Sequence, residues 1–142
     1  MTGNQWIVVG AILAAVGVAL GAMGAHGLEN WLESAFGDPL ERTKRLDNWQ
    51  TAVRYHLFHA IGIILIGLVS ERIGGRLLNF AAELMVLGIL LFSGCLYGWV
   101  LTGSTPLVMI VPIGGVAFIV AWLLFAGAAF VFKSKDDGIK TS

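Results

Sequence analysis

The sequence predicts an all-α membrane protein, built as a four-helix transmembrane bundle with a short interfacial amphipathic helix between spans 1 and 2. Of the 142 residues, 57% are hydrophobic and only 13% are charged, and the mean hydropathy is +0.83. This composition lies far outside the range of soluble domains. Four apolar stretches each approach or exceed the roughly 20 residues that a helix needs to cross a hydrocarbon core. Because backbone groups find no water in lipid, each stretch is expected to be helical.

The spans are expected near residues 6–25, 52–69, 77–101 and 107–132, within a single integral membrane domain over residues 1–142. The run "GAMGA" at the end of the first stretch resembles the small-residue cleavage site of a signal peptide. No Lys or Arg precedes that stretch, whereas the start of a signal peptide normally carries positive charge. We therefore interpret the first stretch as a retained span.

The segment 28–50 between the first two spans has helical periodicity. Its apolar residues Leu28, Trp31 and Leu32 recur at helical spacing with Glu29 on another face, which is typical of a helix lying at the membrane interface. The following run "DPLE" supplies an N-cap residue, a proline at the first helical position and a glutamate three residues beyond the cap. A new helix is expected to start there and to continue into the second span as one long, bent helix.

Charge and cysteine content exclude several classes of function. Nine basic residues balance nine acidic ones, so no net field attracts nucleic acid or an acidic substrate. The single cysteine, Cys95, cannot form an intramolecular disulfide or a CxxC motif. We interpret it as a small packing residue.

Basic residues near the span ends predict the orientation. Arg72 and Arg76 lie in the short second connection, and Lys133, Lys135 and Lys140 follow the last span. With four crossings, these two regions and the N-terminus share one side of the membrane. Both termini are therefore expected in the cytoplasm.

The alternating direction of the spans gathers the unusual motifs at the opposite membrane face. The end of span one, the start of span two, the end of span three and the start of span four all meet there, with "GAMGAHG", "YHLFHA", "FSGCLYG" and "STPLVMIVPIGG". The candidate polar site at this face comprises His26, Tyr55, His56, His59, Ser93 and Tyr97.

Glycines indicate how the helices pack. Without a strong hydrophobic drive between helices in lipid, close backbone approach through small residues is a principal source of attraction. Pro112, followed by two glycines, is expected to interrupt the fourth helix. The glycines assigned to helix packing are Gly17, Gly21, Gly24, Gly94, Gly98, Gly114 and Gly115.

The motifs "LGAMGAHGL", "YHLFHA", "FSGCLYG" and "VPIGGVAFIVAW", in this order and spacing, resemble the YgdD/YwdK-like family of small four-span bacterial membrane proteins. That family is also related to an animal and mitochondrial transmembrane group. The likeness runs from about Ala14 to Trp122, with Met23, Cys95 and Val111 among the departures from the family pattern. Because the pattern has a hydroxyl where this chain has Cys95, no role of its thiol is expected. The resemblance implies a multi-pass protein of the bacterial inner membrane, classed under a domain of unknown function.

The three histidines allow two interpretations. His56 and His59 lie three apart on one helix face, at the membrane level expected for His26. Imidazoles from two helices could bind a metal ion or haem, and the family pattern carries His26 and His59. The sequence holds no HExxH and no cofactor signature. We therefore favour histidines that close helix ends by hydrogen bonding, and we expect no metal and no cofactor, with a proton-linked change of conformation as a lesser alternative.

Glu83 is the one acidic residue well inside a span, which makes it a candidate intramembrane carboxylate. It lies about six residues from the start of the third span, close enough to extend towards the interface. Asn79, one turn earlier, could hydrogen-bond to it. Snorkelling is the favoured interpretation, and Tyr97, Trp99, Trp31 and Trp49 are interpreted as an interfacial aromatic belt.

Three functional hypotheses follow. The favoured one is a non-enzymatic accessory or structural component of the membrane, whose partners are the lipid bilayer and either a second copy of the chain or a larger membrane complex. The second is a small oligomeric transporter or lipid-handling protein. The third is a metal- or haem-binding membrane protein that uses His26 and His59.

Overall fold

The protein is all-helical and contains four helices that are long and apolar enough to cross a membrane. The computed structural model describes the backbone of residues 1–140 and the side chains of residues 1–131. Within that part of the chain no strand occurs, which confirms the predicted fold class. The helices are α1 (Gly3–His26), α2 (Leu28–Ala35), α3 (Pro39–Ile73), α4 (Arg76–Gly88), the π-helix η1 (Ile89–Gly94), α5 (Cys95–Thr102) and α6 (Thr105–Lys140).

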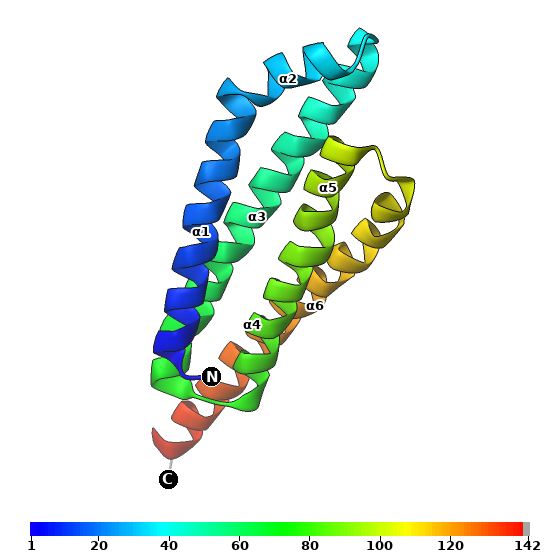
Figure 1. Cartoon of the computed structure of the whole chain (residues 1–142). Coiled ribbons are helices and arrows are strands. Elements are labelled where there is room, and N and C mark those ends of the chain that lie inside the picture. The colour runs from blue at the N-terminus through cyan, green and yellow to red at the C-terminus, as the bar shows by residue number, and fades with distance from the viewer. Residues whose placement is uncertain (141–142) are drawn as a thin grey trace.

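The long helices run up and down beside one another, as Figure 1 shows. α1 packs along α3, and the third span, formed by α4, η1 and α5, lies between α3 and α6. A continuous apolar core joins the spans around fully buried Ile63, Ile66 and Met85, with Trp6 and Phe118 at its edges. Both ends of the described chain lie at the same end of the bundle (Figure 1). Lys133, Lys135 and Lys140, on which the expected orientation partly rests, have side chains outside the described residues.

A second apolar cluster closes the opposite end of the bundle. α2 crosses that end, and its Leu28 and Leu32 pack with Trp49 of α3 and Val100 of α5. Trp31 remains 41% exposed on the other side of α2. The amphipathic helix expected after the first span is therefore present, but it is confined to Leu28–Ala35.

The rest of the expected interfacial segment belongs to α3, which runs for 35 residues. Asp38 caps it by accepting a hydrogen bond from the Leu40 amide (3.0 Å), and Pro39 takes the first helical position, as predicted. Glu41 does not complete a capping box; its carboxylate instead accepts from Arg45, four residues later. The second span is thus the far end of one long helix.

The irregularity expected at Pro112 lies elsewhere. α6 is continuous through Pro112, whereas the third span contains a π-helix at Ile89–Gly94. Proline is tolerated in membrane helices where neighbouring groups compensate for the lost donor. The two features face each other, because the backbone of Phe92 in η1 lies against Gly114 of α6.

Glycines with positive φ form the two tight connections. Gly74 (φ 65°) and Gly75 (φ 116°) separate α3 from α4, and Gly103 (φ 72°) ends α5 in the left-handed conformation. Side chains other than glycine are strained in this region of φ. These turns hold the third span antiparallel to both of its neighbours.

Candidate functional site

Glycines set the register of α1 against α3. A Cβ atom added at Gly10 would stand 2.8 Å from the Ala60 carbonyl oxygen, so the two backbones are in direct contact. The glycines of the first span that were assigned to helix packing face α3 as well. Further along the pair, Gly17 lies against Leu57, Gly21 against Val53 and Gly24 against Trp49.

This register separates His26 from the other two histidines. His56 of α3 lies beside Gly17 of α1. Gly17 precedes His26 by nine residues, which corresponds to about 14 Å along the helix. His26 itself is exposed at the end of α1. The expectation that His26 and His59 lie at one membrane level is wrong, because α3 is already helical long before residue 52. Trp49, and not a histidine, stands opposite the end of α1.

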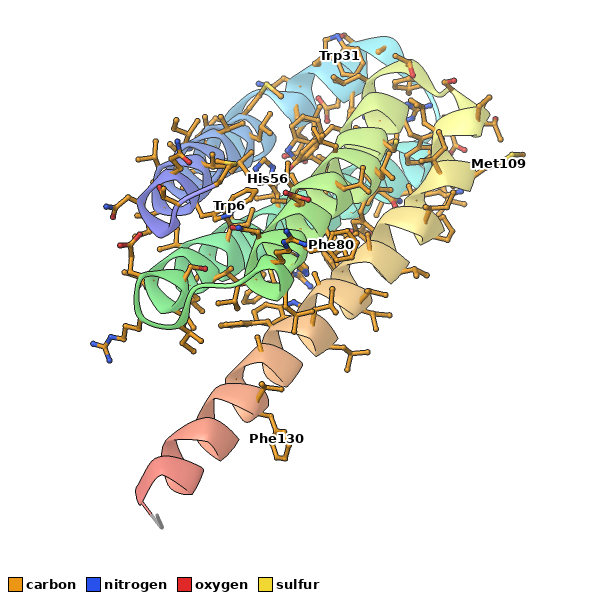
Figure 2. The ribbon with its side chains drawn as sticks, turned by 90° about the horizontal axis from the view of Figure 1, so that it is seen from below. Trp6, Trp31, His56, Phe80, Met109 and Phe130 are labelled. Atoms are coloured by element: carbon orange, nitrogen blue, oxygen red, sulfur yellow. The ribbon has the colours of Figure 1, made fainter. Side chains whose placement is uncertain are left out.

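Four of the other candidate polar residues contact one another in two pairs, His56 with Tyr97 and Tyr55 with His59, and Ser93 is buried one turn before Tyr97. We call Tyr55, His56, His59, Ser93 and Tyr97 the polar junction. His56 is 4% exposed, and the Tyr97 hydroxyl lies 3.5 Å from its Nδ1. Its Nε2 is buried and has no hydrogen-bond partner among the described residues. Figure 2 shows His56 in the interior of the bundle, whereas Met109 and Phe130 point outwards.

His59 is held by its own helix and by α6. Its Nδ1 donates to the Tyr55 carbonyl (2.7 Å), and its ring stacks on Phe118 with 3.4 Å between the ring centroids. The ring of Tyr55 stacks in turn on Phe92 of η1 (4.5 Å). These contacts lock three helices together through aromatic faces.

The π-helix places Ser93 and Phe92 in this junction. Ser93 is fully buried, and its hydroxyl has no hydrogen-bond partner among the described residues. A Cβ atom at Gly114 would stand 2.5 Å from the Phe92 amide nitrogen, whereas one at Gly115 would meet only the Phe92 ring at 3.8 Å. Gly114 thus permits the close approach of α6 to η1. π-helical turns are frequent at functional sites.

Gly94 and Gly98, the two glycines of the third span that were assigned to helix packing, differ from this pattern. A Cβ atom at Gly98 would stand 2.9 Å from the Leu107 side chain of α6. One at Gly94 would meet only the Ile89 carbonyl of its own span, at 3.7 Å. Of these two glycines, only Gly98 lies close to another helix.

Glu83 faces away from the polar junction. It is exposed on the outer face of α4 and makes no ion pair or hydrogen bond with the described residues. Asn79 does not hydrogen-bond to Glu83, because the Asn79 side-chain oxygen accepts a hydrogen bond from the Trp6 indole (2.7 Å). The position fits a carboxylate that extends along the helix surface.

The expected aromatic belt is only partly present. Trp49 is 1% exposed, and its indole Nε1 donates to the Leu20 carbonyl of α1 (2.9 Å). Tyr97 packs on it with 4.7 Å between the ring centroids. Trp49 is therefore a core residue at the end of the bundle, whereas Trp31 is exposed as a belt residue would be.

Arg45 is a structural residue that the sequence analysis did not single out. It is only 4% exposed, and it donates to the carbonyls of Trp99 and Val100 at the end of α5. Its guanidinium also lies 3.9 Å from the centre of the Phe36 ring. The one sequence signal was Glu41 at the i, i+4 spacing, which many exposed pairs share.

No group of three or more His, Cys, Asp or Glu side chains within residues 1–131 is arranged to hold a metal ion. A site shared by His26 and His59 would need the two rings to be adjacent, and the register of α1 against α3 separates them. The contacts within the polar junction are hydrogen bonds and aromatic packing.

Comparison with known proteins assigns the chain to a family. Residues 20–115 match the family model described as "Protein of unknown function (DUF423)". The UPF0382 membrane protein YwdK of Bacillus subtilis is 40% identical over 125 residues, covering 87% of this chain and 94% of that protein. A UPF0382 membrane protein of Haemophilus influenzae is 34% identical over 131 residues, covering 92% and 98%.

No solved structure is significantly similar to this chain. The family match covers the segments that carry α1's glycine-rich end, the polar junction and Gly114. The protein belongs to the DUF423 family of membrane proteins of unknown function.

Proposed function

We propose that the protein is a non-enzymatic structural component of the membrane, which works as a rigid helical unit that binds another membrane protein or a second copy of itself. The observation that carries this proposal is that buried polar side chains form hydrogen bonds between the helices. The Trp49 indole, the Arg45 guanidinium and the Trp6 indole each bond to a different helix. These side chains hold the spans together.

The position of the polar junction supports the same function. Five surface hollows of the described part of the chain are all lined by residues outside the junction. His59 uses one ring nitrogen on the Tyr55 carbonyl and one ring face on Phe118. Such a junction stabilises one arrangement of α3, η1 and α6, which is what a rigid unit requires.

The surface of α2 is suited to contact with a partner. Trp31 is 41% exposed on α2, at the end of the bundle that α2 covers (Figure 2). Tryptophan is enriched among residues that dominate protein interfaces. α2 is also backed by the buried Leu28 and Leu32, so a partner would meet a preformed surface.

Photocrosslinking in intact membranes tests this proposal. A photoreactive phenylalanine analogue replaces Trp31 in one variant and Phe130, an exposed residue near the far end of α6, in the control. A discrete adduct at position 31 but not at position 130 is expected. Its mass distinguishes a second copy of the chain from another protein.

Absence of any discrete adduct at position 31 would contradict the proposal. So would solute flux in proteoliposomes that is lost on Glu83→Gln, because that result would favour the alternative of a transporter. The outward position of Glu83 on α4 supports the structural function over that alternative.

A further inference from the structure

We propose that the groove between α3 and α6, beside the last turns of α5, binds one anionic phospholipid, with its phosphate at Lys44 and an acyl chain over Leu96 and Val108. The groove has a volume of about 300 Å³. This goes beyond a structural function, since it assigns a ligand to a defined surface. The lining residues are Lys44, Asn48, Leu96, Trp99, Thr105 and Val108.

Three helices build the groove. α5 forms its floor, because the third span lies between α3 and α6 (Figure 1). Leu96 of α5 is 5% exposed, whereas Val108 on the α6 wall is 41% exposed. The floor is therefore part of the bundle, and the α6 wall opens towards the surrounding lipid.

The polar end of the groove lies nearer the aqueous boundary than its apolar end. Lys44 and Trp99 stand at one level, because the Lys44 Nζ lies 5.6 Å from the centre of the Trp99 ring. Leu96 lies about one turn before Trp99 in α5, which runs towards the end of the bundle that α2 covers. α6 runs back from that end, so Val108 lies one turn deeper than Thr105. A phosphate at Lys44 therefore sits at the headgroup level, while an acyl chain extends inwards over the apolar residues.

The charge of the groove is complementary to an anionic headgroup. Lys44 is the one charged residue among those that line it, and it is exposed and forms no ion pair with the described residues. Asn48, one turn deeper on α3, donates through its side-chain nitrogen to the Lys44 carbonyl (2.8 Å). An amide nitrogen carries two N–H groups, so one is left for the ester oxygens below a phosphate. An ammonium group binds phosphate as a point charge and attracts anionic lipid.

The floor of the groove is fixed before any lipid binds. The Trp99 carbonyl accepts hydrogen bonds from the Arg45 guanidinium (3.2 Å) and from the Gly103 amide (2.7 Å). These bonds hold the last turn of α5 against α3. A preformed surface binds with a smaller loss of conformational entropy.

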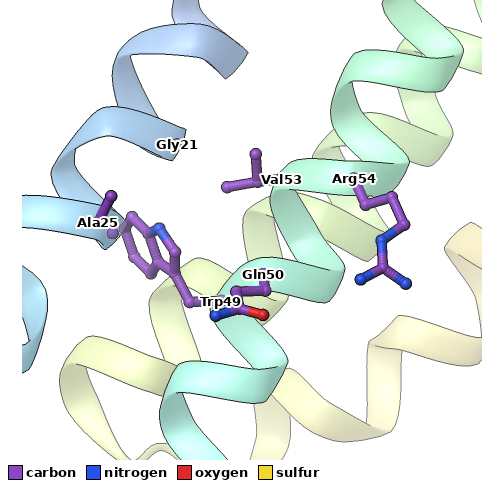
Figure 3. Close-up of a pocket in the computed structure, with 7 residues that line it drawn as sticks. Gly21, Ala25, Trp49, Gln50, Val53 and Arg54 are labelled. Atoms are coloured by element: carbon purple, nitrogen blue, oxygen red, sulfur yellow. The ribbon is translucent and has the colours of Figure 1, made fainter.

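The hollow between the ends of α1 and α3 has no such order of polar and apolar residues. Its glycine wall, at Gly21 and Gly24, faces Trp49 and Val53, whereas the Arg54 side chain points away from α1 (Figure 3). A phosphate at Arg54 would therefore not place an acyl chain in that hollow. Arg54 instead provides a control, as an exposed cation of the same helix that does not line the groove between α3 and α6.

Native mass spectrometry of the detergent-purified protein tests the proposal. The protein is mixed with equimolar phosphatidylglycerol and phosphatidylcholine, and the ratio of the two one-lipid complexes is measured. The wild type should favour phosphatidylglycerol. Lys44→Gln should reduce this preference about fivefold, since one basic residue near a membrane surface contributes about 1 kcal/mol.

Matched variants separate the groove from general charge effects. Arg54→Gln removes the other cation and should leave the ratio close to that of the wild type. Lys44→Arg keeps the positive charge and should retain most of the preference. Val108→Phe fills the apolar end of the groove and should reduce retention of both lipids, whereas Met109→Phe, at a 73% exposed neighbouring position that points outwards, should not (Figure 2).

Three results would overturn the proposal. The first is an equal effect of Lys44→Gln and Arg54→Gln, which would indicate only the general attraction of anionic lipid. The second is equal lipid retention in Val108→Phe and Met109→Phe variants of normal helicity. The third is displacement of phosphatidylglycerol by glycerol phosphate at the same concentration, which would indicate a site for the phosphate group alone.

Discussion

Arg45 of α3 reaches the end of the third span and donates from one nitrogen to the carbonyls of Trp99 and Val100. These carbonyls lie in the last turn of α5, where the Trp99 carbonyl also accepts a hydrogen bond from the Gly103 amide (2.7 Å). Acceptors at the end of a helix commonly bind side chains in addition to backbone amides. A cation there also interacts favourably with the helix dipole. The same guanidinium stacks on Phe36, so one side chain joins α3, α5 and the residue that follows α2.

Arg45→Met should destabilise the protein by about 3 kcal/mol, because hydrogen bonds to charged groups each contribute about 1.5–3 kcal/mol. Reversible unfolding in mixed micelles measures this change in free energy. Arg42→Met is the control, since Arg42 pairs with Glu33 at 3.5 Å on a more exposed surface and should cost less than about 1 kcal/mol. Equal losses in the two variants would contradict a structural role of Arg45.

Gly114→Ala should destabilise the bundle by about 1–3 kcal/mol, because the new methyl group would overlap the backbone of the π-helix at Phe92. Gly115→Ala adds the same group in ordinary contact with the Phe92 ring and should be neutral. Thermal unfolding in detergent compares the two neighbouring variants. If Gly114→Ala were as stable as Gly115→Ala, the close approach of α6 to η1 would be refuted.

Trp49→Phe should lower the free energy of unfolding by at least about 1 kcal/mol, since it removes the hydrogen bond to the Leu20 carbonyl and part of a buried ring. Trp31→Phe, at a 41% exposed position, should change it by less than about 0.5 kcal/mol. The same unfolding assay serves both variants. A larger effect at Trp31 than at Trp49 would restore the belt interpretation for Trp49.

Glu83→Gln should leave the stability unchanged, because Glu83 lies on the outer face of α4 without a polar partner among the described residues. Asn79→Leu, one turn away, should instead destabilise by about 0.5–1.5 kcal/mol through loss of the bond from Trp6. The contrast is measured by unfolding in the same detergent. A strong defect in Glu83→Gln alone would give that carboxylate a role that its position does not suggest.

The helices themselves can be predicted from the sequence, because their positions depend on composition and on local signals. Apolar length predicted the four spans, and the Asp38 and Pro39 pair predicted the start of α3. The periodicity of Leu28 and Leu32 predicted α2. Each of these signals acts within a few residues of the element that it specifies.

The details of the polar junction could not be predicted, since they depend on how one helix lies against another. The register that pairs Gly24 with Trp49 moves His26 away from His59, although both sit in recognisable motifs. The π-helix at Ile89–Gly94 has no clear local signal, and its partner Gly114 lies on another helix. In the sequence, Arg45 is one of several charged residues between the first two spans. Only the structure shows that it contacts the end of α5.

Cysteine accessibility in intact membrane vesicles tests the four-span arrangement most directly. In a background where Cys95 is replaced by serine, single cysteines at Ser34 in α2 and Ser104 between α5 and α6 should react with an impermeant reagent from the same side. A cysteine at the exposed Arg76, the first residue of α4, should react only from the opposite side. Labelling of positions 34 and 104 from opposite sides would contradict the fold on which the polar junction and the contact of Arg45 with α5 both depend.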